Sequence, residues 1–103
     1  MKIYFLSDAR TELLEARNWY ESKRLGLGSE FLAEVRRCVA SVVQSPERFA
    51  RVPKLAKVRN IRQATVGRFP FSIIYRLQAE QIAILAIAHQ HRKPTYWHGR
   101  MKP

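Results

Sequence analysis

The chain has 103 residues, 47% of them hydrophobic, and its 19 Lys and Arg residues outnumber 8 Asp and Glu, for a formal net charge of +11. This length suffices for one two-layer core, so we expect a single domain over residues 1–103. No apolar run approaches the roughly 20 residues that span a bilayer, and the apolar part of MKIYFLSDAR is too short for a secretion signal. We therefore expect a cytoplasmic protein with no membrane partner.

The single cysteine, Cys38, has no second cysteine with which to form a disulfide or a metal site. We expect neither a metal nor another cofactor.

The positive charge is concentrated in the second half of the sequence. Residues 1–46 contain seven basic and six acidic residues, whereas residues 47–103 contain twelve basic residues and only Glu47 and Glu80. Such a field attracts polyanions, either nucleic acid or an acidic protein. The alternative is a generally basic surface that only keeps the protein soluble.

A strand and two helices are predicted in the first half. Residues 2–6 are rich in β-branched and aromatic side chains and stop at Ser7 and Asp8, which we expect to cap a helix. Helical spacing of apolar residues then runs from residue 9 to about residue 24, and again from Ser29 to about Gln44. The apolar stripes are Ala9, Leu13, Ala16 and Tyr20, then Phe31, Val35, Cys38, Val39 and Val42. The glycines and serine of LGLGS, with Ser29 as the second cap, predict an antiparallel helical hairpin.

Three strands are predicted in the second half, after an irregular basic link over residues 47–57. They cover residues 58–66, 71–77 and 81–89. The middle one alternates, with Phe71, Ile73, Tyr75 and Leu77 on one face. The last is apolar on both faces, which places it at the centre of a sheet. The predicted order is β-α-α-β-β-β, an α+β fold.

Three stretches of this sequence together resemble the RelE/ParE family of type II toxin-antitoxin toxins, often described as plasmid stabilisation proteins. They are EARNWYESKRLGLGSEF, VGRFPFSIIYR and AIAHQHRKPTYW, and the resemblance covers nearly the whole chain. It implies an antiparallel sheet that carries the helical hairpin on one side. It also implies a growth-inhibiting toxin that is neutralised by a cognate antitoxin protein, whose C-terminal segment wraps around the toxin.

The family leaves two activities open. RelE-like members cut mRNA in the ribosome, which requires a base for the 2′-hydroxyl, cations around the phosphate and an acid for the leaving oxygen. ParE-like members inhibit DNA gyrase by binding it and need no such catalytic set.

Several residues are candidates for RNA cleavage. His89 lies at the end of the last predicted strand as a possible acid or base, and His91, Arg92, Lys93 and Tyr96 follow it. A basic surface on the same face is expected from Lys54, Lys57, Arg59, Arg62, Arg68 and Arg76. The alternative is that His89 is an ordinary strand-end histidine bonded to a backbone carbonyl, and that the basic link is solvated.

The pattern of RNase members is incomplete here. Their middle strand generally carries an arginine where this sequence has Ser72, and the tail has His91 where an arginine is expected. The resemblance is therefore closer to the ParE-like branch, and we expect an inhibitor of DNA gyrase rather than an enzyme acting on mRNA.

The sequence after the last strand is predicted to be an exposed contact segment, His89 to Arg100, because Pro94 breaks the strand and turns the tail outward. Its expected gyrase-binding residues are Arg92, Lys93, Tyr96, Trp97 and Arg100. Trp19 and Tyr20, on the first helix, are expected to be core or interface residues. A third possibility is a binding module that is not toxic and contacts only an antitoxin or operator DNA.

Overall fold

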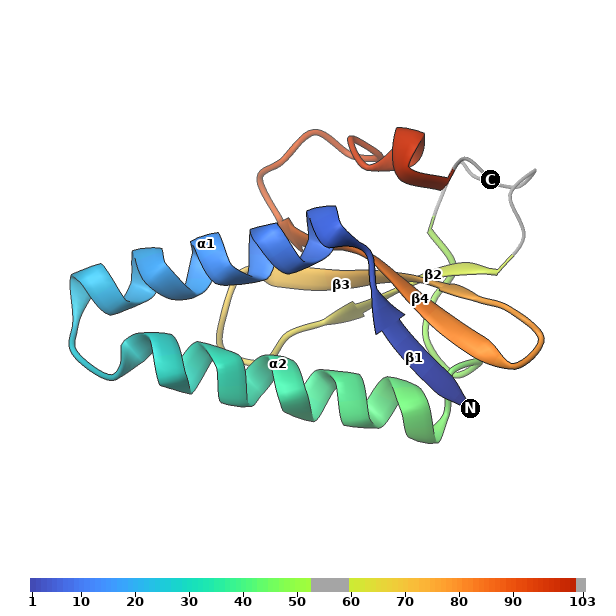
Figure 1. The fold of residues 1–103 in the computed structure, drawn as a ribbon, viewed down its shortest axis with the longest axis horizontal. Coiled ribbons are helices and arrows are strands. Elements are labelled where there is room, and N and C mark those ends of the chain that lie inside the picture. Colours follow the sequence, from blue (N-terminus) through green and yellow to red (C-terminus); the bar gives the residue numbers. More distant parts are fainter. Residues whose placement is uncertain (53–59, 102–103) are drawn as a thin grey trace.

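The computed structural model describes residues 1–52 and 60–101, and it confirms the α+β fold and the order β-α-α-β-β-β. Figure 1 shows the two helices running side by side along one side of the sheet. The elements are β1 (Lys2–Phe5), α1 (Ser7–Lys23), α2 (Leu27–Gln44), β2 (Ile61–Thr65), β3 (Phe71–Leu77) and β4 (Gln81–His89). A short 3₁₀ helix, η1 (His98–Met101), follows and was not predicted.

The sheet has the strand order β1-β4-β3-β2, so the strand that is apolar on both faces lies inside it, as predicted. The pairs β2–β3 and β3–β4 are antiparallel, but β1 runs parallel to β4. The sheet is therefore mixed rather than antiparallel throughout. Parallel neighbours need a long crossover between them, and the helical hairpin belongs to the crossover that joins β1 to the rest of the sheet.

One edge of β4 is open over its second half. β1 ends opposite Ile84, and the β3–β4 register changes there, since Ile74 faces Ala86 while Tyr75 faces Ile84. Leu85 is the extra residue of this bulge. The backbone of β4 beyond Ile84 therefore has no β1 neighbour.

Apolar side chains cover both faces of the sheet. Between the sheet and the helices lies the larger cluster, to which both apolar stripes predicted for the helices contribute. Phe31 is fully buried there, with its ring 5.2 Å from the rings of Tyr20, Phe69 and Phe71. Cys38 belongs to the same cluster, and burial raises the pKa of its thiol to about 11. In the described part of the chain, neither helix combines the length and apolar character needed to cross a membrane.

The helix caps differ from the prediction. α1 begins at Ser7, with Leu6 in the cap position and no side-chain cap, and α2 begins at Leu27 rather than at Ser29. The cap of α2 comes from α1 instead: the backbone N–H groups of Gly26 and Gly28 each donate to the Glu21 carboxylate at 2.9 Å. Two orphan donors at a helix N-terminus are thus satisfied by a side chain from the preceding helix.

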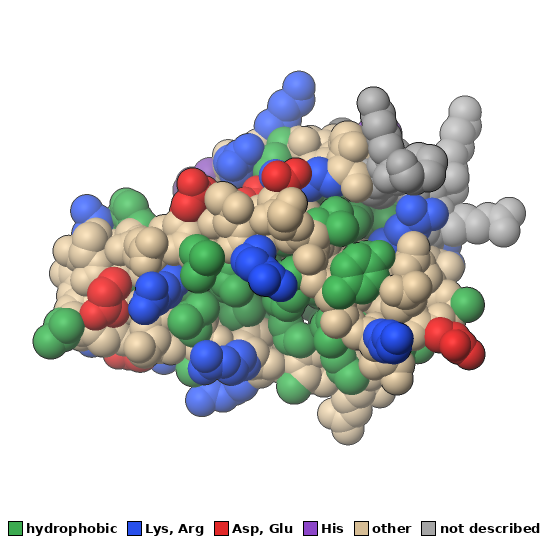
Figure 2. Space-filling model, in the orientation of Figure 1, with side chains coloured by type: hydrophobic (Ala, Val, Ile, Leu, Met, Phe, Trp, Pro, Cys, Tyr) green, Lys and Arg blue, Asp and Glu red, His purple; other side chains and the backbone are tan. Residues whose placement is uncertain are grey.

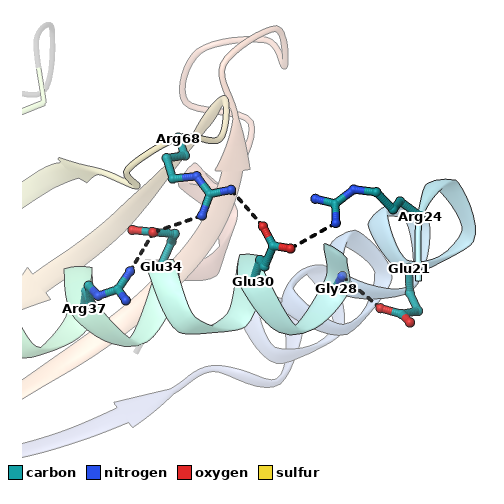
Figure 3. Close-up of polar contacts among 7 residues, drawn as sticks. All are labelled: Glu21, Arg24, Gly28, Glu30, Glu34, Arg37 and Arg68. Atoms are coloured by element: carbon teal, nitrogen blue, oxygen red, sulfur yellow. Dashed lines mark hydrogen bonds and ion pairs between the residues drawn. The ribbon is translucent and has the colours of Figure 1, made fainter. Parts of the chain in front are cut away.

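Figure 3 shows that a chain of ion pairs continues from this hairpin along α2. Arg24 and Arg68 both bond Glu30, at 3.1 and 2.8 Å, and Arg68 also approaches Glu34 at 3.6 Å. Arg68 lies in the β2–β3 connection with φ 69, in the left-handed region. The network therefore ties the β2–β3 turn to α2.

These contacts predict a loss of stability in acid. Hydrogen bonds from the backbone of Gly26 and Gly28 lower the pKa of Glu21, and those from Arg68 and Arg24 lower the pKa of Glu30. A carboxyl whose pKa is lower in the folded state stabilises the protein above its ordinary pKa of 4.5, and the benefit disappears as pH falls through the folded value. The melting temperature should therefore fall as pH drops below about 4.5.

Glu21→Gln should flatten that decline because it removes one of the titrating groups, whereas Glu80→Gln should not. Glu80 is exposed, and its side chain makes no hydrogen bond or ion pair within the described residues. A Glu21→Gln protein whose melting temperature follows the wild-type pH curve would contradict the assignment.

Candidate functional site

The candidate site lies where β4 ends, in residues 89–100, which we call the C-terminal segment. The structure does not turn this segment outward at Pro94 as predicted. Instead it returns across the face of the sheet opposite the helices, where Trp97 packs in a second apolar cluster with Ile74 and Leu85. The segment that the sequence predicted to be exposed therefore covers part of this face.

The prediction that the whole segment is exposed is wrong for Trp97, which is buried. Alternate residues of β3 and β4 form an apolar surface on the face of the sheet opposite the helices, which we call the far face. Trp97 covers this surface and is therefore only 3% exposed. Tyr96 and Arg100 are also partly buried, whereas Arg92 and Lys93 are exposed. Of the five side chains expected to contact gyrase, these two are the most accessible.

Glu12 of α1 anchors the segment, and the sequence analysis did not find it. Arg100 makes a bidentate pair with its carboxylate, with both N–O distances 2.9 Å, and the Tyr96 hydroxyl donates to it at 2.6 Å. Burial and the bond to Glu12 raise the pKa of Tyr96, and the bond to Glu12 raises that of Arg100. These partners are 84 and 88 residues from Glu12 in sequence, so no local pattern could have indicated them.

Two hollows flank the start of the C-terminal segment, and His89 and Arg92 line both. The first has a volume of about 510 Å³ and lies against α1, with Glu15, Trp19 and Phe71 among its lining residues. The second has a volume of about 690 Å³ and lies on the far face of the sheet. Its lining residues include Ser72, Ile74, Ala88, Lys93 and Trp97.

The hydrogen bonding of His89 restricts its chemistry. The backbone N–H of His91 donates to its Nδ1 at 3.0 Å, so the neutral ring carries its proton on Nε2. The Nδ1 lone pair is therefore occupied, and Nε2 is a donor. His89 can act as a base only if it gives up the bond to His91.

Of the six residues predicted to form a basic surface, the three that the structure describes are held at separate places. Arg62 donates to the backbone carbonyls of Glu47 and Phe49, after α2, and Arg68 is held by the glutamates of α2. Arg76 pairs with Ala83, at the other end of the β3–β4 ladder from the pair of Phe71 and His89. Lys54, Lys57 and Arg59 lie outside the described residues.

The comparison with protein families shows the family to which this chain belongs. The family described as "ParE toxin of type II toxin-antitoxin system, parDE" matches residues 3–94, most of the chain. The chain belongs to the ParE toxin family. Membership implies a cognate antitoxin partner, as predicted.

A solved structure is similar to this ParE-family chain over almost all of its own length. It is a chain of the "Chromosomal ParDE TA system from P. aeruginosa", with a TM-score of 0.69 and 23% sequence identity. The match covers 86% of this chain and 95% of the other. The comparison with curated proteins gave no significant match.

The cations of this ParE-family chain are spread widely over the helical side. In Figure 2, Lys and Arg side chains lie in separate groups over the visible face, with hydrophobic side chains between them. Trp19 is one exposed aromatic residue, 57% accessible with the Lys23 ammonium 4.9 Å from its ring, whereas Tyr20 packs against the core. Within the described residues no three His, Cys, Asp or Glu side chains are grouped as a metal site.

Proposed function

We propose that this chain acts as the growth-inhibiting toxin of its toxin-antitoxin pair by binding DNA gyrase, with Arg92 and Lys93 as its principal contact residues. The observation that supports an inhibitor rather than an RNase is the state of His89, whose Nδ1 is already occupied by the backbone of His91. A general base must have a free lone pair within reach of the proton that it removes.

The second hollow supports the same proposal. Its lining has Ser72 at the strand position where RNase members generally carry an arginine, and its two cations, Arg92 and Lys93, both come from the C-terminal segment. Cations around the phosphate are the main source of transition-state stabilisation in such a reaction. A pair of exposed cations that no carboxylate in the described structure neutralises is better suited to binding an acidic protein surface.

The test is a supercoiling assay with purified toxin and gyrase, alongside an assay of ribosome-bound mRNA. We expect the wild-type protein to inhibit supercoiling and to leave mRNA intact. Arg92→Glu/Lys93→Glu should weaken inhibition at least tenfold, about 1.4 kcal/mol, because arginine anchors commonly contribute that much or more at interfaces. His89→Ala should inhibit supercoiling like the wild type.

The control is Arg10→Glu/Arg36→Glu, which changes the net charge by the same amount at exposed positions on the two helices. Equal weakening by both double variants would indicate that only net charge matters. Site-specific mRNA cuts that disappear in His89→Ala would establish the RelE-like activity instead. Growth that continues when the chain is expressed without its antitoxin would favour the non-toxic module.

A further inference from the structure

We infer that Glu12 is the positioning residue of the gyrase-contacting segment: it fixes Tyr96 and Arg100 and, through the Tyr96 ring, sets the place of Arg92. The inference rests on the proposed function for the role of Arg92. The anchoring of the segment by Glu12 stands on its own geometry.

The carboxylate of Glu12 joins three parts of the fold. Its Oε1 accepts the backbone N–H of Ile87 at 3.0 Å, on the edge of β4 that β1 leaves open. The same carboxylate accepts hydrogen bonds from the Tyr96 hydroxyl and from both terminal nitrogens of Arg100. The Glu12 side chain is only 13% exposed, so these bonds are shielded from water.

Arg100 completes the attachment to the same edge. Its Nη1 donates to the carbonyl of Leu85, the extra residue of the bulge, at 3.1 Å, and its Nε lies 3.5 Å from the carboxylate of Asp8. One guanidinium therefore links the start of α1, the middle of α1 and the backbone of β4. A partly buried bidentate pair with satisfied partners fixes orientation as well as position.

Tyr96, which Glu12 holds by a hydrogen bond, positions Arg92. Its guanidinium carbon lies 3.9 Å from the centre of the Tyr96 ring, a cation–π contact, while the carbonyl of His89 accepts its backbone N–H at 3.0 Å. The residue before Tyr96, Thr95, has φ 64, a strained value for a β-branched side chain. Such a conformation persists only where the surroundings over-determine it, and the anchors at Tyr96, Trp97 and Arg100 do so here.

The first test uses the toxin alone. In a Trp19→Phe background Trp97 is the remaining tryptophan of the chain, and its emission reports whether the C-terminal segment covers the sheet. Glu12→Gln keeps the shape of the side chain but presents an amide to Arg100 and Tyr96. We expect a red shift of Trp97 emission and faster quenching by acrylamide.

Glu15→Gln is the matched control. Glu15 is on the same helix as Glu12, and both line the first hollow. Glu15 makes no hydrogen bond or ion pair with another described residue. It should leave Trp97 emission unchanged. Unchanged emission in Glu12→Gln as well would overturn the inference. If Glu12→Gln does not fold, Tyr96→Phe removes one bond without a change in charge and should produce a smaller shift in the same direction; no shift would overturn the inference.

The second test is a double-mutant cycle on gyrase inhibition. We expect Glu12→Gln to weaken inhibition about tenfold and Arg92→Ala to weaken it at least as much, and the double variant to be no weaker than Arg92→Ala. Independent effects that multiply would show that Glu12 does not act through Arg92. If the wild type does not inhibit gyrase, the proposed function fails, while Trp97 emission still decides whether Glu12 holds the segment.

Discussion

Replacing Trp97 with alanine should lower the free energy of unfolding by about 3–5 kcal/mol. The indole covers Ile74, Leu85 and their neighbours on the far face of the sheet, and it is 3% exposed. The substitution removes this apolar contact and leaves a cavity that the strands cannot collapse to fill. For a chain of this size the melting temperature should fall by about 12 °C or more.

Trp19→Ala is the internal control for this prediction, because Trp19 is 57% exposed and removal of an exposed side chain usually has a small effect. Thermal unfolding followed by circular dichroism compares the two variants directly. Equal losses of stability would contradict the buried position of Trp97. The same burial means that deletion of residues 93–103 would expose the far-face cluster, so point variants at Arg92 and Lys93 are the better test of gyrase binding.

Gly28→Ala should destabilise the protein by about 1–3 kcal/mol, although alanine is the better helix former. A Cβ at this position would lie 2.7 Å from the carbonyl oxygen of Arg17 and 2.9 Å from Oε1 of Glu21. The first of these atoms is backbone and cannot move alone, so the two helices must separate. That movement also weakens the bonds from Glu21 to the N-terminus of α2.

Gly99→Ala supplies the comparison, since a Cβ there meets no atom within 4 Å. It should change stability by less than about 0.5 kcal/mol. Urea unfolding should show a lower midpoint for Gly28→Ala with an unchanged slope. A stabilised Gly28→Ala variant would mean that α1 and α2 are further apart at this crossing than the structure places them.

The sequence predicted those parts of the fold that depend on local pattern. The bounds of β3 and β4 follow from alternation and from a run that is apolar on both faces, and both agree with the structure. The apolar stripes of the helices were likewise confirmed as core. β2 is shorter than the predicted strand, from Ile61 to Thr65, although residues 58 and 59 lie outside the described part.

What failed was the placement of the C-terminal segment, and the reason is physical. Pro94 ends a strand whether the chain then turns into solvent or back across the sheet, so it carries no information about direction. The direction is set by the open edge of β4, by the apolar far face and by Glu12, all distant in sequence. Amphipathic residues such as Tyr96, Trp97 and Arg100 suit an interface and a covered sheet equally well.

The parallel pairing of β1 with β4 has a consequence for synthesis on the ribosome. Ile3 is translated well before its neighbour in the sheet, Ile82, which follows it in the sequence by 79 residues. Until then the nascent chain has two amphipathic helices and no strand against which β1 can be placed, a situation that favours slow, late folding and transient exposure of apolar surface. A chain that stops before β4 therefore lacks the strand that joins both sides of the sheet, and prematurely terminated copies should be inert.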